Sequence, residues 1–166
     1  MKGLITMKNK LISLLRQNAR LSNEQLAVML GTTEAQVAAE IRSLEEQGVI
    51  MGYSAIVNEE KIEGEKVTAI IELRVTPQKD CGFDEIAKII TQYEEVERVS
   101  LMAGAYDLEV TVKGDNVKDI AMFVYQKLAT LSGVLSTATH FVLKTYKEKG
   151  IFIETEEKDE REFLIP

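Results

Sequence analysis

The sequence predicts an α+β chain of two domains, in which three short helices precede a domain with the element order β-α-β-β-α-β. Two observations carry this prediction. Helix-capping signals and helical spacing of apolar residues run up to Gly48, and from Val67 the apolar spacing changes to the two-residue period of strands. With 166 residues and 45% hydrophobic composition, the chain has room for two small domains with buried cores.

The first helix is predicted over residues 7–18, where Leu11, Leu14 and Leu15 have helical spacing. Two further helices follow, each announced by a capping box, in which a hydroxyl and an amide side chain pair with the backbone at the helix start. The two boxes are Ser22 with Gln25 and Thr33 with Gln36.

Glycines end both of these helices, because Gly31 and Gly48 tolerate the left-handed backbone of a helix terminus. On the helix that begins after Thr33, the residues Val37, Ile41 and Leu44 form one apolar stripe, which predicts the side that faces the core. The opposite side carries small or polar residues. This pattern is typical of a helix-turn-helix, whose second helix enters the DNA major groove; a helical hairpin without a role in DNA binding is the alternative.

Composition limits the classes of function. The net charge is −7, but residues 1–52 carry six basic and five acidic side chains, so the segment that could read DNA is the only one that is not acidic. One cysteine and one histidine exclude an intrachain disulfide and any metal site built from Cys and His. A metal site built from carboxylates alone is the alternative, but no loop has the spacing for one, so we expect no cofactor and no metal. With no long apolar run and no signal peptide, we expect a cytoplasmic protein without a membrane partner.

The second half of the chain predicts a four-stranded sheet with two helices. Strands are expected over VTAIIELRV, over VERVSLMA, from Tyr106 to Lys113, and from Val134 to about Tyr146. Helical spacing predicts helices within residues 82–93 and from residue 115 or 116, the latter with an apolar stripe formed by Val117, Ile120, Ala121, Val124 and Leu128. This order is the ferredoxin-like arrangement, with both helices on one face of the sheet.

The predicted domains are a winged helix-turn-helix at 1–52, a linking strand and linker at 53–65, the ferredoxin-like domain at 66–149 and an acidic tail at 150–166. The β-rich residues 49–57 are expected to form the wing and the linking strand. The sheet face away from the helices is expected to show apolar residues and therefore to be covered by dimerisation. For the tail, disorder and an added edge strand are both open.

Four stretches together resemble the leucine-responsive regulatory protein and AsnC family of transcription regulators. They are ARLSNEQLA, IRSLEEQGVIMGY, MAGAYD and GVLSTATHFVLK. The resemblance covers residues from about Met7 to Lys147. It implies a DNA-binding regulator whose ferredoxin-like domain dimerises through its sheet, often in rings of four dimers that would make an octamer, and binds an amino acid between subunits. One departure from the family is Glu40, where members usually place an arginine, so any binding to double-stranded DNA is expected to be weak.

The residues predicted to contact DNA follow from the recognition-helix geometry. Gln36 can pair with adenine, Arg42 with guanine, and Ala35 and Ala39 can touch a thymine methyl group; a solvated helix face is the alternative. The full predicted set is Arg20, Ser22, Thr33, Ala35, Gln36, Ala39, Arg42 and Ser43.

The effector site is predicted at the glycine hairpin between the second and third strands. Backbone N–H groups near Gly104 are expected to bind a carboxylate, and Asp107 to bind an ammonium group; an ordinary outward strand residue is the alternative for Asp107. The full predicted set is Met102, Gly104, Ala105, Tyr106, Asp107, Thr137 and Thr139.

Two other functions are alternatives. The first is an amino-acid sensor or assembly protein of the same build that has lost DNA binding, or binds DNA very weakly. The second is an enzyme that resembles haem-precursor decarboxylases, which would need several basic or histidine side chains converging on the second domain. Because the chain has only His140 and an acidic surface, we expect no enzyme and no catalytic residues.

Overall fold

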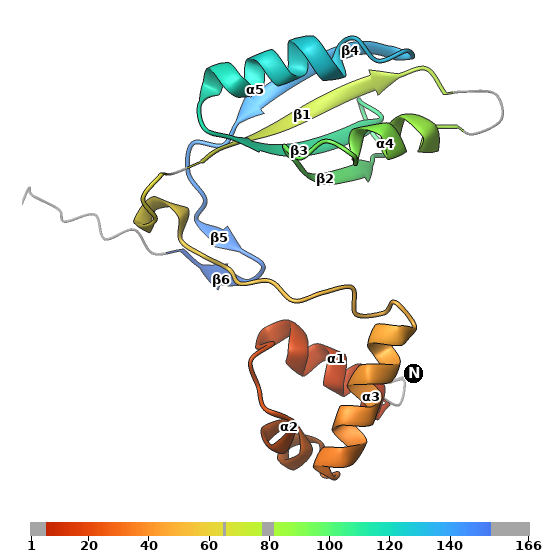
Figure 1. The fold of residues 1–166 in the computed structure, drawn as a ribbon, viewed down its shortest axis with the longest axis vertical. Helices are drawn as coiled ribbons and strands as arrows, with labels where there is room; N and C mark the ends of the chain where they lie inside the picture. The colour runs from red at the N-terminus through yellow and green to blue at the C-terminus, as the bar shows by residue number, and fades with distance from the viewer. Residues whose placement is uncertain (1–5, 65, 78–81, 154–166) are drawn as a thin grey trace, which may run out of the picture. The chain divides into compact units, whose positions relative to one another are not determined.

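The computed structural model describes residues 6–64, 66–77 and 82–153. Its contacts divide the chain into two compact units, and the boundary in the sequence falls between Ala55 and Ile56 (Figure 1). We call them the helical unit and the sheet unit, and each is described by itself.

The helical unit contains three helices, as expected. They are α1 (Met7–Gln17), α2 (Asn23–Leu30) and α3 (Glu34–Glu46). Both predicted capping boxes form, and Gly31 ends α2 in the left-handed conformation with φ of 66°. The core consists of Leu11, Leu26, Ala27, Val37 and Leu44.

The segment after α3 differs from the prediction. Residues 50–58 form no strand, and the next element is the 3-10 turn η1 (Glu59–Lys61). A β-strand needs a neighbour that satisfies its backbone groups, and no strand among the described residues pairs with this segment. Tyr53 instead donates a hydrogen bond from its hydroxyl to Glu45 Oε1 of α3 at 2.9 Å.

The sheet unit has the predicted ferredoxin-like topology. Its elements are β1 (Val67–Val75), α4 (Asp84–Ile90), β2 (Val96–Leu101), β3 (Leu108–Gly114), α5 (Val117–Phe123), the π-helical turn η2 (Val124–Leu128) and β4 (Val134–Phe141). The strand order is β2-β3-β1-β4, and every neighbouring pair is antiparallel. Both helices lie on one face (Figure 1).

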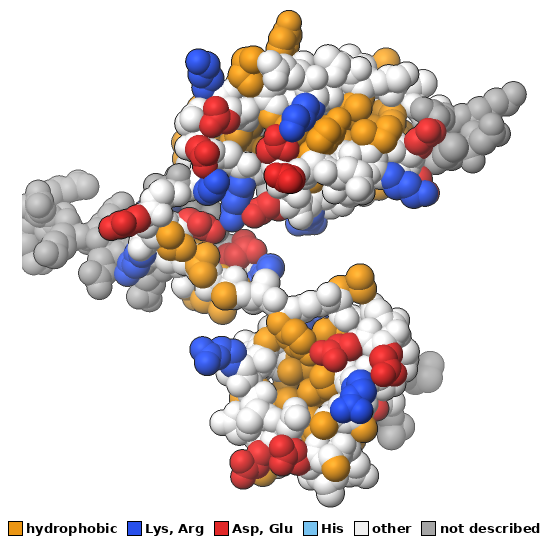
Figure 2. All heavy atoms as spheres, viewed as in Figure 1, with side chains coloured by type: hydrophobic (Ala, Val, Ile, Leu, Met, Phe, Trp, Pro, Cys, Tyr) orange, Lys and Arg blue, Asp and Glu red, His pale blue; other side chains and the backbone are white. Residues whose placement is uncertain are grey.

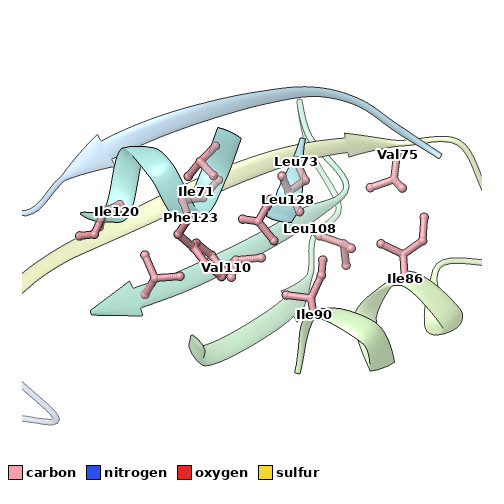
Figure 3. Packing of buried hydrophobic residues seen from close by; sticks show 13 residues of the cluster. Ile71, Leu73, Val75, Ile86, Ile90, Leu108, Val110, Ile120, Phe123 and Leu128 are labelled. Atoms are coloured by element: carbon pink, nitrogen blue, oxygen red, sulfur yellow. The ribbon is translucent and has the colours of Figure 1, made fainter. Parts of the chain in front are cut away.

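The core of this unit lies between that face and the helices (Figure 3). Alternate residues of β1 and β3, such as Ile71 and Val110, point at Ile86 and Ile90 of α4 and at Ile120 of α5.

The last helix differs in detail from the predicted stripe. Val117 and Ala121 are exposed, whereas Phe123, which the stripe omits, is buried. The helix continues into a π-helical turn, which changes the spacing of core-facing positions after Phe123.

β4 is also shorter than predicted and ends at Phe141, which pairs with Ala69 of β1. Just after this end, Val142 N–H donates a hydrogen bond to Thr68 O of β1 at 2.9 Å. Beyond it, β5 (Lys147–Glu148) and β6 (Ile151–Phe152) form a separate small hairpin. The rest of the predicted acidic tail, residues 154–166, lies outside the described residues.

The expectation of an apolar second sheet face is wrong. Residues that alternate with the core positions point to this face, and pairing places Glu72 beside Glu109 and Thr68 beside Lys113. His140 of β4 lies on the same face, with Nε2 at 3.4 Å from Glu72 Oε1. The other residues of this face on β1–β4 are Ile70, Arg74, Arg98, Ser100, Thr111, Ser136 and Ala138. The strands therefore alternate apolar and polar residues more strictly than predicted, which leaves this face largely polar.

Polar contacts attach the linker to the sheet unit. Lys113 Nζ lies 3.0 Å from Glu59 Oε1 of η1 and 3.1 Å from Glu97 Oε1 of β2. The hydrogen bond to Glu59 raises the pKa of Lys113. Residues around η1 are thus held against the end of β3.

Candidate functional site

Helix α3 presents the face that the sequence predicts for DNA. Val37 and Leu44 are buried in the core, which turns the opposite side of the helix to solvent. Ala35, Gln36, Ala39 and Arg42 are exposed there, and Ser43 is half-buried. Arg20, Ser22 and Thr33 are exposed at the starts of, or just before, the two helices. The predicted set is therefore accessible.

Four side chains of this set already have partners, since Ser22 and Thr33 cap their helices and Gln36 and Ser43 are also hydrogen-bonded. Gln36 Oε1 accepts from the Thr33 N–H and the Thr33 hydroxyl, both at 3.2 Å, and from the Thr32 hydroxyl. Ser43 Oγ accepts from Gln47 Nε2 at 2.7 Å. A bidentate bond from Gln36 to adenine requires the same oxygen, so base reading by Gln36 competes with the cap of its own helix.

The charge on this face is mixed. Arg42 is the only basic residue of α3, and Glu40 lies half-buried two positions before it. Lys8 of α1 donates a hydrogen bond from Nζ to Gln47 Oε1 at 3.2 Å, which places its ammonium group near the end of α3. Figure 2 shows acidic and basic side chains interspersed on the visible face of this unit. Lys10, Arg16 and Arg20 are exposed and can add phosphate contacts.

The second candidate site is the hairpin of residues 102–107 between β2 and β3. Met102 N–H donates to Asp107 O at 2.8 Å and closes the hairpin. Ala103, Gly104 and Ala105 are exposed, and none of their N–H groups donates a backbone hydrogen bond within the part of the chain that the structure describes. Such a run of N–H groups on a glycine-containing turn is suited to an anion.

Asp107 has a structural partner that the sequence did not reveal. Its Oδ2 accepts from the Val75 N–H at 2.8 Å, and its own N–H donates to Leu73 O at 2.9 Å. Tyr106 beside it donates its hydroxyl to Glu109 Oε2 at 3.2 Å. Partial burial and this bond to a carboxylate raise the pKa of Tyr106.

The two threonines are not gathered around the hairpin. Thr137 pairs with Leu73 and Thr139 with Ile71, so both lie half-buried on the face that the helices cover. Thr137 lies level with Leu108, the first residue after the hairpin, but β1 lies between them. Thr139 lies two residues further along β4, away from the hairpin. Within one chain, the structure brings together Met102 and Asp107 and leaves Thr139 apart.

The residues that shape the end of β1 were not predicted from the sequence. Arg74 pairs with Ser136 and Val75 with Val134, so Leu135 is an extra residue in β4 and makes a β-bulge. Gly133 precedes the bulge, with φ of +93°. No periodic signal marks such an insertion, since the residues on either side of it alternate normally.

The described residues contain no group of three or more His, Cys, Asp or Glu side chains that could hold a metal ion. Nor does any helix among them have the length and apolar character to cross a bilayer.

Comparison with known proteins gives two family matches. The Lrp/AsnC ligand-binding domain matches residues 68–152, and a winged helix-turn-helix DNA-binding domain matches residues 7–51.

Relatives of known sequence match over nearly the whole chain. An uncharacterised HTH-type transcriptional regulator of Bacillus subtilis, YugG, is 42% identical over 160 residues, which cover 96% of each chain. The leucine-responsive regulatory protein of Haemophilus influenzae is 26% identical over 92% of this chain and 91% of its own.

Among solved structures, the transcriptional regulator NMB0573 of Neisseria meningitidis, in complex with L-Met, has the same fold. The TM-score is 0.69 at 22% identity, with 86% of this chain and 92% of that chain covered. The two family matches, taken with the helix-turn-helix and the βαββαβ sheet, show that the chain belongs to the Lrp/AsnC family of DNA-binding transcriptional regulators.

Proposed function

We propose that this regulator responds to an α-amino acid that binds at the hairpin of residues 102–107. The observation that carries the proposal is the row of N–H groups at Ala103, Gly104 and Ala105, which belong to exposed residues and have no backbone acceptor among the described residues. They suit an α-carboxylate. The match to a ligand-binding domain and the L-Met complex of the Neisseria relative support an amino acid as the ligand.

Specificity would come from apolar side chains around the hairpin. Leu101 is 61% exposed and Met102 37% exposed, and both directly precede the N–H row. An aliphatic or small polar amino acid fits this surrounding better than a basic one. We propose Tyr106 and Asp107 as further residues of the site, and Thr137 and Thr139 as residues that contribute where subunits meet.

Calorimetry with the twenty amino acids tests this site. Ala105→Pro removes one N–H of the row, whereas the control Ala105→Ser keeps it. We expect heat from at least one amino acid with the wild type and with Ala105→Ser, and a weaker affinity with Ala105→Pro. Equal affinity of all three proteins would place the ligand elsewhere, and no heat with the wild type would refute the proposal.

We further propose that the exposed face of α3 contacts DNA, with Arg42 at a base edge and with Lys10, Arg16 and Arg20 at phosphates. Gln36 and Ser43 would serve mainly through the helix that they stabilise. With so few basic groups, affinity should be low and steeply dependent on salt.

Glu40→Arg tests this orientation, because it removes a repulsion and adds a cation. We expect stronger binding to the promoter of the protein's own gene in a gel-shift salt series. Glu94→Arg makes the same charge change at an exposed position of the sheet unit and serves as the control. Equal affinities of the two variants would show that α3 does not face DNA.

A second candidate function is an amino-acid sensor that no longer binds DNA. The observation that favours it is Arg42 as the single basic residue of α3, with Gln36 engaged in a cap. Absence of any shift at low salt, with amino-acid binding intact, would establish this alternative.

We also propose a homodimer that assembles to an octamer. Because the open sheet face is polar, such an interface would rest on paired charges and on exposed apolar residues at the sheet edges, such as Leu101 and Leu135. Light scattering that finds only an 18.6 kDa species at micromolar concentration would refute it.

A further inference from the structure

The hairpin of residues 102–107 leaves the sheet before β1 ends, so the last residues of β1 have no β3 backbone opposite them. β1 and β3 pair from Val67 with Gly114 to Leu73 with Leu108, and there the regular register ends. The N–H of Val75, two residues beyond Leu73, points to the same side of β1 as the carbonyl of Leu73, toward β3. No β3 backbone carbonyl is in register to accept from it.

The Asp107 side chain takes the place of that carbonyl. Its Oδ2 lies 2.8 Å from Val75 N, while its backbone N–H donates to Leu73 O at 2.9 Å. Val75 is only 3% exposed, so water cannot readily replace the carboxylate as acceptor.

The same place is fixed from the other side by β4. Thr76 N–H donates to Gly133 O at 2.8 Å, and the bulge at Leu135 shifts the register of β4 between Arg74 and Val75. The end of β1 is thus held by β4 through backbone bonds and by the hairpin through one side chain. Asp107 also accepts from Met102 N–H through its backbone carbonyl, so one residue joins both arms of the hairpin to β1.

We propose that Asp107 is a positioning residue, whose carboxylate oxygen holds the hairpin against β1 by accepting from the Val75 N–H. This inference rests on the proposed function for its consequence: amino-acid binding depends on Asp107 through the position of the N–H row and not through an ion pair with the ligand ammonium group. The conservative replacement by asparagine separates these two roles, because Asn keeps an acceptor oxygen and loses the charge.

The test compares Asp107→Asn and Asp107→Ala by amide hydrogen exchange at Val75 and Met102, followed by calorimetry with the amino acid that the wild type binds. We expect exchange at Val75 to rise about tenfold or more in Asp107→Ala and to stay within about threefold of the wild type in Asp107→Asn. Amino-acid affinity should follow the same order.

Asp115→Ala is the matched control, since it removes a carboxylate just beyond the other end of β3, where Asp115 is 2.6 Å from Lys66 Nζ. It should leave Val75 exchange unchanged. Unchanged Val75 exchange in Asp107→Ala would overturn the proposal. Loss of binding in Asp107→Asn with Val75 still protected would also overturn it, because the charge would then be what matters. If the wild type bound no amino acid, the effector proposal would fail, and the exchange data would still decide the positioning role.

Discussion

In the helical unit, the residues that define each helix lie three or four positions apart, whereas in the sheet unit Ile71 of β1 pairs with Val110 and Thr139 from distant parts of the chain. Ser22 and Thr33 each cap a helix with a partner three residues on. The hairpin that carries the proposed effector site is held instead by Asp107, whose partner is Val75. The structure of the helical unit can therefore be predicted from its sequence in detail, whereas only the topology of the sheet unit can.

A cavity in the small helical core should have the largest effect. Leu44 has no exposed surface and belongs to a core of five buried residues, so Leu44→Ala should lower the free energy of unfolding by roughly 2 to 5 kcal/mol. Circular dichroism during thermal unfolding should show the helical unit melting first. Leu143→Ala, at a residue 94% exposed, is the control. A single transition for both units would show that they unfold together.

The two units should differ in how they tolerate alanine at a left-handed glycine. A Cβ at Gly133 would lie 2.9 Å from Ile86 Cδ1, while one at Gly31 meets nothing within 4 Å. Gly133→Ala combines backbone strain with overpacking, about 2 to 4 kcal/mol, against roughly 1 to 2 kcal/mol of strain alone for Gly31→Ala. Urea unfolding of both variants measures the difference. Equal losses would mean that Ile86 moves aside without penalty.

Removal of one cap should have a smaller effect confined to the helical unit. Ser22→Ala deletes the hydroxyl that accepts from Gln25 N–H at 3.1 Å and should lower stability by about 1 kcal/mol. Ser13→Ala, at an exposed position within α1, is the control and should be near neutral. A loss at Ser13 as large as that at Ser22 would show that the cap has no special role.

The smallest expected effect is a pH dependence in the sheet unit. The Lys127 ammonium, 2.6 Å away, lowers the pKa of Glu95 from its usual 4.5. A lowered folded-state pKa adds stability above the unfolded value, which is lost as pH falls below 4.5.

Glu95→Gln should therefore reduce stability at neutral pH by less than about 1 kcal/mol, because both partners are partly exposed, and by nothing in strong acid. Urea midpoints at pH 7 and at about pH 3 measure this, with Glu94→Gln as the neighbouring control. A loss that persists in acid would point to packing against Tyr93 and Phe123, whose rings lie near Lys127.

The sequence by itself determined the three helices, both capping boxes, the order of strands and the family, because these depend on local spacing and on short continuous motifs. It also placed the α3 face and the hairpin correctly on accessible surface. It predicted the capping box that occupies the Gln36 oxygen, and the structure shows that this bond competes with base reading by the same residue.

Only the tertiary structure decided the surroundings of Asp107, the polar character of the open sheet face and the absence of a strand in residues 50–58. The first and the last depend on which distant backbone lies alongside, and the sheet face depends on which side of each strand the helices cover. By sequence pattern Asp107 is an outward-pointing strand residue, but in the structure its side chain accepts from the Val75 N–H, which has no acceptor on the β3 backbone. A β-bulge at Leu135 leaves no periodic trace, yet it sets where β1 ends and therefore where that N–H is.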